Sequence, residues 1–286
     1  MVKLIAIIGA TGLQGGSVLK TFHASGEYKI RAITRNPNSN TVKDLSKKYA
    51  GVEWVQADLN NLSSLSKAFS GADVVFGVTN SVDADLIQRI QSGDYEADTM
   101  YSIKKLSGGK YSGAFHLETK YNAEQYLLSK ASQIKGFILH LGSYLENFTG
   151  TARIADDQTI EFPFSVKPTT KLPFVDTAND TGPVAKYALE NPEECLGLPL
   201  EVSGGYYEAQ EIAKAYTEAT GKPARYVQIP YDAMGLDFVT QMFKSFDEFG
   251  YFGFSTEFVE RNKKINHKFV TPTEFWKNLK WEGPSK

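Results

Sequence analysis

The first quarter of the chain alternates between short apolar runs and stretches in which apolar residues recur at helical spacing. The apolar run at 4–8 predicts a buried strand, and segments rich in apolar residues predict further strands at 28–34, 52–56 and 74–78. The helical spacing predicts helices at 15–24, 41–49 and 62–69, and Asn60 and Asn61 mark the start of the last one. Strands that alternate with helices are typical of a parallel sheet covered on both faces.

The same pattern returns more weakly in the rest of the chain. It predicts a helix at 118–129, strands at 137–141 and 199–202, and a helix at 209–219. From Gly150 onward proline, threonine and polar residues dominate, and residues 243–254 are rich in aromatics, which could form a core or line a cleft. We therefore predict an α/β domain at 1–150, its sheet completed by about 175–205, and a smaller lobe at 151–286 that binds a substrate or partner.

Composition narrows the class of protein. The formal net charge of −2 gives no basic footprint for nucleic acid, and no apolar run reaches the length of a membrane span. The single cysteine, Cys195, allows no internal disulfide and favours a reducing compartment, the cytoplasm or the nucleus. The four histidines show no metal-ligand spacing, so no metal site is expected.

Three glycines lie between the first predicted strand and the first predicted helix, in Gly9-Ala10-Thr11-Gly12-Leu13-Gln14-Gly15. In this context Gly9 permits a tight turn, Gly12 lets backbone approach a pyrophosphate, and Gly15 lets the helix pack closely on the strand. The helix N-terminus offers free N–H groups to the phosphates. The alternative is a glycine-rich turn with a purely structural role.

The end of the second strand, Ala32-Ile33-Thr34-Arg35-Asn36, indicates which dinucleotide is bound. An NAD site would place a carboxylate there for the ribose hydroxyl. Arg35 instead offers a planar cation suited to a ribose 2′-phosphate, so NADP(H) is favoured; the alternative is a solvated surface arginine. Asp58, after the third strand, has two interpretations, a place near the adenine and a cap of the next helix.

Several stretches together resemble the NmrA-like family of atypical short-chain dehydrogenase/reductases. They cover nearly the whole chain and read IIGATGLQGGSV, RAITRNP, VFGVTN, HLETKYNAEQYL, GSYLENF and LPFVDTANDTGPVAKYALENPEECLGLPLEVSG. The resemblance implies a Rossmann-type, doubly wound α/β domain that binds NADP(H), and a smaller, mostly helical C-terminal lobe. The cofactor contacts that we expect are Gly9, Thr11, Gly12, Leu13, Gln14, Gly15, Arg35, Asp58, Thr79, Asn80, Lys120, Tyr144 and Asn147.

The resemblance also points to candidate catalytic residues. Typical short-chain dehydrogenases carry Tyr-x-x-x-Lys, in which the tyrosine donates a proton and the lysine lowers its pKa and holds the ribose. Here the tyrosine position holds His116, with Lys120 four residues later on the same helix face. The alternatives are a surface histidine before a helix and a solvated helix lysine.

The chain departs from the family in one region. Family members follow the fourth strand with a loop, a helix and a fifth strand that ends near serines. No clear apolar strand is visible between Thr99 and Phe115, so one helix and the fifth strand are expected to be missing near Thr99–Tyr101. A missing strand leaves ladder groups unpaired and removes the serine that a dehydrogenase would use.

These features leave two functions open. An intact dinucleotide half beside a degraded catalytic set favours an NADP(H)-binding, redox-sensing regulator that binds a partner protein in a cofactor-dependent way. The alternative is an NADPH-dependent reductase of a small carbonyl or quinone, in which Lys120 positions the nicotinamide and His116 or water supplies the proton.

Overall fold

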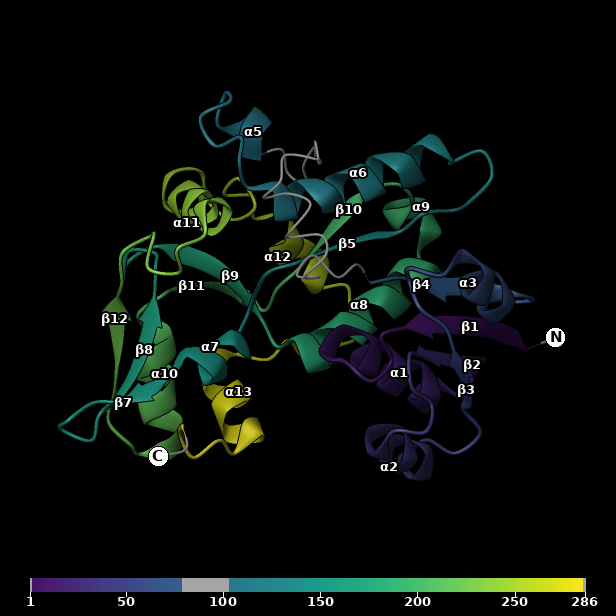
Figure 1. The fold of residues 1–286 in the computed structure, drawn as a ribbon, viewed down its shortest axis with the longest axis horizontal. Helices are drawn as coiled ribbons and strands as arrows, with labels where there is room; N and C mark the ends of the chain where they lie inside the picture. The colour runs from purple at the N-terminus through teal and green to yellow at the C-terminus, as the bar shows by residue number, and fades with distance from the viewer. Residues whose placement is uncertain (1, 79–102, 285–286) are drawn as a thin grey trace. The chain divides into compact units, whose positions relative to one another are not determined.

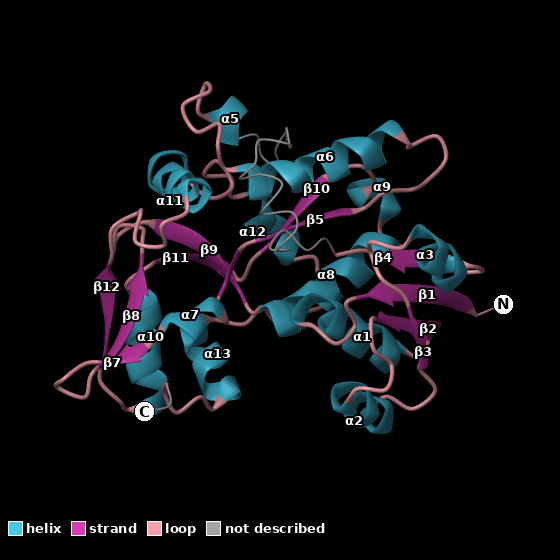
Figure 2. Ribbon diagram, viewed as in Figure 1, coloured by secondary structure: helices cyan, strands magenta, loops and turns pink. Residues whose placement is uncertain are grey.

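The computed structural model of the chain describes residues 2–78 and 103–284 (Figures 1 and 2). The chain forms two compact units, which are described separately. The first comprises Met1–Thr79, Thr177–Pro192 and Ile265–His267, and the second comprises Asn80–Asp176, Glu193–Lys264 and Lys268–Lys286. The boundary near residue 150 between the predicted domain and the predicted lobe stays a prediction.

A four-stranded parallel sheet forms the centre of the first unit. It consists of β1 (Lys3–Ile8), β2 (Tyr28–Thr34), β3 (Glu53–Gln56) and β4 (Val74–Phe76), in the order β3-β2-β1-β4. The register places Ile5 of β1 beside Ile30 of β2 and Val74 of β4. All four strands lie where the apolar runs predict them.

Helices cover both faces of this sheet, as the alternating pattern predicts. The first part of the chain supplies α1 (Leu13–Ser25), α2 (Asn40–Lys48) and α3 (Leu62–Phe69). One face of the sheet carries Ala6 and Ile33, which pack with Ala68 of α3. Successive strand residues point to opposite faces, so Ile5 and Ile7 lie on the side of α1. The Asn61 side chain accepts a hydrogen bond from Ser64 N at 3.0 Å and caps α3, which confirms the predicted start.

Gly15 sets the distance between α1 and the end of β1. A Cβ atom at this position would lie 2.3 Å from the Gly9 carbonyl oxygen and 2.7 Å from the Ile8 carbonyl oxygen. Any side chain would therefore push the helix off the strand. This confirms the expectation that Gly15 permits close helix–strand packing.

A helix from later in the chain, α8 (Thr177–Glu190), packs alongside α1 in the same unit (Figure 1). Gly182 N donates a hydrogen bond to Ser17 Oγ at 2.9 Å, and a Cβ atom on Gly182 would lie 2.3 Å from the Ser17 carbonyl oxygen. His267 Nε2 lies 2.7 Å from Oδ1 of the fully buried Asp180, which joins residues 265–267 to this helix. The sequence pattern did not predict α8.

The second unit contains a separate two-stranded parallel sheet. It pairs β5 (Ile138–Leu141) with β10 (Pro199–Val202), and both strands were predicted. The predicted helix at 118–129 lies within α6 (Phe115–Ser129). Residues 103–114 hold the short helix α5 (Ile103–Leu106) and turns, with no strand, and residues 99–102 lie outside the described part.

Two three-stranded sheets complete the second unit, so the expectation of a mostly helical lobe is incomplete. One sheet has the order β12-β8-β7 and the other β11-β9-β6. Their strands are β6 (Ser143–Tyr144), β7 (Arg153–Ile154), β8 (Ile160–Phe164), β9 (Lys171–Val175), β11 (Gly205–Glu208) and β12 (Ala224–Gln228). The helices of this unit not yet named are α7 (Asn147–Thr151), α9 (Pro192–Cys195), α10 (Glu211–Thr220), α11 (Asp237–Phe249), α12 (Glu257–Asn262) and α13 (Pro272–Leu279).

Aromatic side chains fill the core of the second unit. Trp276 of α13 packs edge-on against Tyr216 of α10, with ring centroids 5.2 Å apart, and its indole N–H donates to the Ile212 carbonyl. In the aromatic-rich segment, Phe243, Phe246 and Phe252 are buried. Their burial favours the core interpretation of that segment over a cleft lining.

We expect Gly15→Ala to destabilise the protein. The added methyl group meets backbone, which cannot rotate away, and overpacking of this kind costs about 1–3 kcal/mol or more. Gly16→Ala is the matched control, because a Cβ atom there would lie 3.5 Å from the nearest atom, in ordinary contact. Urea unfolding should show a lower midpoint for Gly15→Ala, and an unchanged or slightly higher one for Gly16→Ala. Equal midpoints for the two variants would contradict the packing argument.

Candidate dinucleotide-binding site

The glycine loop forms a tight connection between the carboxyl end of β1 and the start of α1. Gly9 has a φ of 67°, in the left-handed region that favours glycine. Gly12 N donates to the Gly9 carbonyl at 2.8 Å, and Gly16 N donates to the Gly12 carbonyl at 2.8 Å. The predicted role of Gly9 in the turn is therefore confirmed.

Gly12 differs from the other two glycines, because nothing in the described chain requires a glycine there. Its φ of −98° is open to any residue, and a Cβ atom would lie 3.4 Å from its nearest neighbour, the Gly9 carbonyl oxygen. Thr11, Gly12 and Leu13 are exposed. The missing side chain keeps an open surface next to the first turn of α1.

The first turn of α1 is suited to an anion. The N-cap residue, Gly12, has no side chain that could cap the N–H groups of the helix, and the turn contains no acidic residue. Residues Leu13, Gln14 and Gly15 provide the N–H groups of this turn. The site thus combines exposed backbone, a positive helix end and an absence of competing carboxylates within the turn.

The two arginines near the end of β2 have different environments. The Arg31 side chain is held by protein groups: it pairs with Glu53 at 2.8 Å and donates to the carbonyls of Ala68 and Ser70 at the end of α3. Arg35 is exposed, and its guanidinium makes no hydrogen bond or ion pair with the residues described. Its carbonyl accepts from Gln56 Nε2 at 3.0 Å, which ties it to the end of β3. Arg35 therefore presents a free cation on a fixed backbone.

Asp58 does not cap the helix that follows it, so that interpretation is wrong. The cap is Asn61, and Asp58 Oδ1 instead accepts from Asn60 N at 2.9 Å in a local turn. Asp58 N also donates to Ser64 Oγ at 3.1 Å. Asp58 lies after β3 at the carboxyl edge of the sheet, where Arg35 follows β2. A role near the adenine stays a prediction.

The remaining candidate residues fall outside the first unit or outside the described residues. Thr79 and Asn80 lie outside the described residues. Tyr144 ends β6, and Asn147 is exposed at the start of α7. His116 lies on α6, where its side chain is not described.

Lys120, on α6, is partly buried, and this burial lowers the pKa of its amine. The amine forms no hydrogen bond or ion pair with the described residues.

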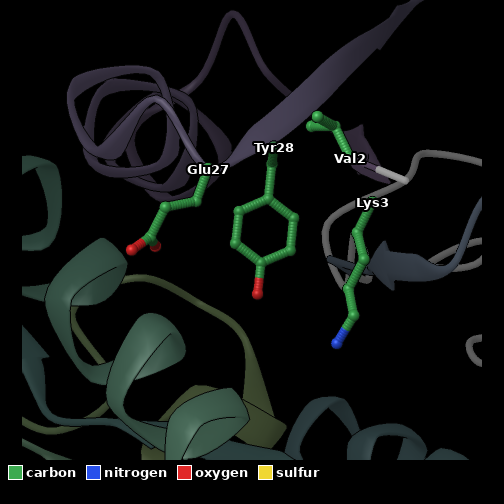
Figure 3. A pocket seen from close by; sticks show the side chains of 4 residues that line it. All are labelled: Val2, Lys3, Glu27 and Tyr28. Atoms are coloured by element: carbon green, nitrogen blue, oxygen red, sulfur yellow. The ribbon is translucent and has the colours of Figure 1, made fainter.

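A pocket in the first unit lies at the other end of the sheet. Figure 3 shows its lining by Val2, Lys3, Glu27 and Tyr28. Lys3 and Tyr28 are paired at the amino ends of β1 and β2, whereas the glycine loop follows the carboxyl end of β1. Burial, Glu190 and Glu27 raise the pKa of the Tyr28 hydroxyl. This pocket is distinct from the glycine loop.

Sequence reasoning missed a buried polar pair near Lys120. His140 Nε2 lies 2.8 Å from Glu124 Oε2, and His140 is 2% exposed. A signal was present, because a histidine within the apolar strand segment FILHL must find a polar partner when it is buried. The search for metal-ligand spacing among the histidines could not reveal it.

Two further results concern the described residues. None of their helices has the length and apolar character needed to cross a membrane. No group of three or more His, Cys, Asp or Glu side chains among them is placed to hold a metal ion.

Several solved structures share this fold. The structure of NmrA, a negative transcriptional regulator, in complex with NADP matches with a TM-score of 0.76 and 19% identity, over 97% of this chain and 95% of that one. The NADPH-dependent quinone oxidoreductase QOR2 of Escherichia coli, complexed with NADPH, matches with a TM-score of 0.66 and 20% identity, over 97% of this chain and 100% of that one. Both likenesses support the Rossmann-type α/β fold.

Relatives of known sequence extend the match. The NmrA-like family domain-containing oxidoreductase cpsB of Aspergillus campestris is 30% identical over 264 residues, 81% of this chain and 77% of that protein. An NmrA-like family domain-containing protein of Dictyostelium discoideum is 25% identical over 305 residues, 94% of this chain and 99% of that protein. That alignment is longer than the 286 residues of this chain, so it opens gaps in this chain.

The sequence model of one family, described as the NmrA-like family, matches residues 1–276. This match spans both units of the structure, including the glycine loop and the helix that carries Lys120. The chain belongs to the NmrA-like family.

Proposed function

We propose that this protein binds a nicotinamide dinucleotide at the glycine loop. The observation that carries the proposal is Gly12, whose missing side chain serves neither the backbone conformation nor the packing of the described chain. A ligand that comes close to the backbone accounts for it, and the positive N-terminal end of the α1 dipole suits a pyrophosphate. NmrA in complex with NAD or NADP, and QOR2 complexed with NADPH, give the same proposal support from related folds.

The preferred form in this proposal is NADP(H). Arg35 is exposed and free of partners among the described residues, at the end of the strand where an NAD site would place a carboxylate. A guanidinium forms paired, charge-assisted hydrogen bonds to a phosphate. Leu13 and Gln14 of the first turn, Thr11 of the loop and Asp58 after β3 are the further contacts proposed in the first unit. Thr79, Asn80, Lys120, Tyr144 and Asn147 complete the proposed set.

The proposed role is that of a redox-sensing regulator, in the cytoplasm or also the nucleus, that binds a partner protein according to the cofactor bound. Reduction of a carbonyl by NADPH requires a proton or a strong hydrogen bond at the oxygen as the hydride arrives. The tyrosine position holds His116, and the serine of a fifth strand is not found in the sequence. NmrA itself is a negative transcriptional regulator, which supports this role.

A reductase of a small carbonyl or quinone is the second candidate. Relatives named oxidoreductases favour it, as does the likeness to the NADPH-dependent quinone oxidoreductase. A lysine whose pKa is lowered by burial is also common in functional sites. In this case Lys120 would hold the ribose and nicotinamide, and His116 or water would deliver the proton.

Gly12→Val should abolish dinucleotide binding and leave the fold intact. The new side chain would occupy the space of the pyrophosphate, and the extended backbone at Gly12 accepts valine without strain. Binding is measured by the quenching of protein fluorescence and the fold by the far-UV spectrum. Retained affinity in a folded variant would mean that the loop is a structural turn.

Arg35→Glu should remove the preference for NADP(H). The loss of a charge-assisted contact to phosphate costs about 1.5–3 kcal/mol, or roughly tenfold to a hundredfold in affinity. Lys29→Glu is the matched control, because it makes the same charge change on an exposed residue at the far end of β2. Calorimetric titration with NADP and NAD should show the change in Arg35→Glu alone. Equal affinities for both nucleotides in the unmutated protein would refute the preference.

The regulator and the reductase are separated by turnover. We expect measurable NADPH binding with little or no NADPH consumption on a panel of aldehydes, ketones and quinones, because general acid help is worth about a hundredfold to ten-thousandfold and its usual donor is absent. Lys120→Ala should weaken cofactor binding, and His116→Ala should leave it nearly unchanged. Rapid NADPH consumption that falls in His116→Ala would establish the reductase instead.

A further inference from the structure

Helix α6 places a carboxylate one turn from the candidate lysine. Lys120 and Glu124 are four residues apart, so their side chains share one face of the helix. A lysine and a glutamate at this spacing ordinarily attract each other, and a partly buried pair gains more than an exposed one. Glu124 is therefore the natural partner of Lys120 on its own helix.

The structure shows Glu124 paired with a different group. Its Oε2 atom lies 2.8 Å from Nε2 of His140, on strand β5. Both side chains are well shielded from water, at 3% exposure for His140 and 11% for Glu124. Lys120, by contrast, makes no ion pair or hydrogen bond within the described part of the chain. The Glu124 carboxylate is thus paired with His140 of β5 and not with Lys120 of its own helix.

We propose that His140 is a positioning residue for Lys120: by holding the Glu124 carboxylate against β5, it keeps Glu124 from pairing with Lys120 and leaves the amine available to the cofactor. Because this inference concerns what the amine is free to bind, it rests on the proposed role of Lys120 in dinucleotide binding. It goes further by assigning the availability of the amine to two residues that the glycine loop and the Tyr-x-x-x-Lys pattern do not include.

Burial of the Lys120 amine increases what the lysine would gain from pairing with Glu124. Desolvation lowers the pKa of Lys120, so its charged form is less stable than in water and would gain strongly from a nearby carboxylate. Without His140, Glu124 would lose its buried partner as well. Both groups would then gain from forming the Lys120–Glu124 pair, which would compete with the cofactor for the same amine.

The test is the pKa of Lys120 in His140→Leu. Leucine has no ring nitrogens to bind Glu124, and its apolar side chain is similar in bulk to that of histidine. Trace acylation over a pH series, read by mass spectrometry of the peptide that contains Lys120, gives the pKa without any cofactor. We expect it to rise by about one to three pH units, the size of a direct ion-pair effect, and NADPH affinity to fall. Exposed Lys67, on α3, is the internal reference and should not change.

Two further variants separate positioning from a merely structural role. In His140→Leu combined with Glu124→Gln, the carboxylate is gone, and the pKa of Lys120 should return to that of the unmutated protein. Glu124→Gln alone should leave this pKa nearly unchanged, because the carboxylate serves His140. A fall of about one pH unit or more in Glu124→Gln would show that Glu124 already supports the lysine, and would overturn the proposal even if His140→Leu does not fold.

The outcomes also distinguish this inference from the proposed function. An unchanged pKa of Lys120 in folded His140→Leu would overturn the positioning role, whatever the protein binds. If the pKa of Lys120 rises in His140→Leu but the unmutated protein binds no dinucleotide, the effect of His140 on Lys120 is supported and the proposed cofactor site is refuted. A raised pKa together with weakened NADPH binding supports both.

Discussion

The position of helix α1 is the constraint on which the first unit depends. On one side Gly15 lies against the backbone of Gly9 and Ile8, at a distance that admits no Cβ atom. On the other side Ser17 lies against Gly182 of α8, at a similar distance and with a hydrogen bond. The helix is held against the end of β1 and against α8 by contacts that leave no room for a Cβ atom at Gly15 or Gly182. Its N-terminus is therefore fixed at the carboxyl end of β1 before any ligand arrives, which lowers the entropic cost of binding.

The sequence predicts the first sheet well, because each of its strands is a short segment rich in apolar residues that lies between predicted helices or turn residues. It fails where proline enters a strand. Pro163 lies in β8 and Pro173 in β9, and a proline in an apolar run argues against a central strand. The register explains both: β7 pairs with β8 at Ile160 and Glu161 alone, and β6 pairs with β9 at Phe174 and Val175. Each proline thus lies beyond the shorter neighbouring strand, where no ladder hydrogen bond is needed on that side.

Helix α8 escaped prediction for a related reason. Gly182 and Pro183 are adjacent in its middle, and both residues disfavour a helix interior. The tertiary contact outweighs this preference, since the Gly182 N–H donates to Ser17 Oγ of α1 and a Cβ atom at this position would lie 2.3 Å from the Ser17 carbonyl oxygen. Gly182 therefore weakens α8 as an isolated helix but permits its close contact with α1. Local propensity cannot reveal this gain, because Ser17 lies far from Gly182 in the sequence.

In the candidate site, too, the sequence predicts the features set by local backbone geometry and does not predict those set by tertiary contacts. The roles of Gly9 and Gly15 in the turn and the packing follow from backbone geometry, which strand–turn–helix spacing encodes directly. The state of Lys120 does not, since it depends on burial and on which partner holds Glu124. A helix pattern shows that Lys120 and Glu124 share a face and would suggest an ion pair; the strand that brings His140 to Glu124 reverses that conclusion. In our proposal, what the Lys120 amine can bind therefore depends on His140 and Glu124, two residues that the Tyr-x-x-x-Lys pattern does not include.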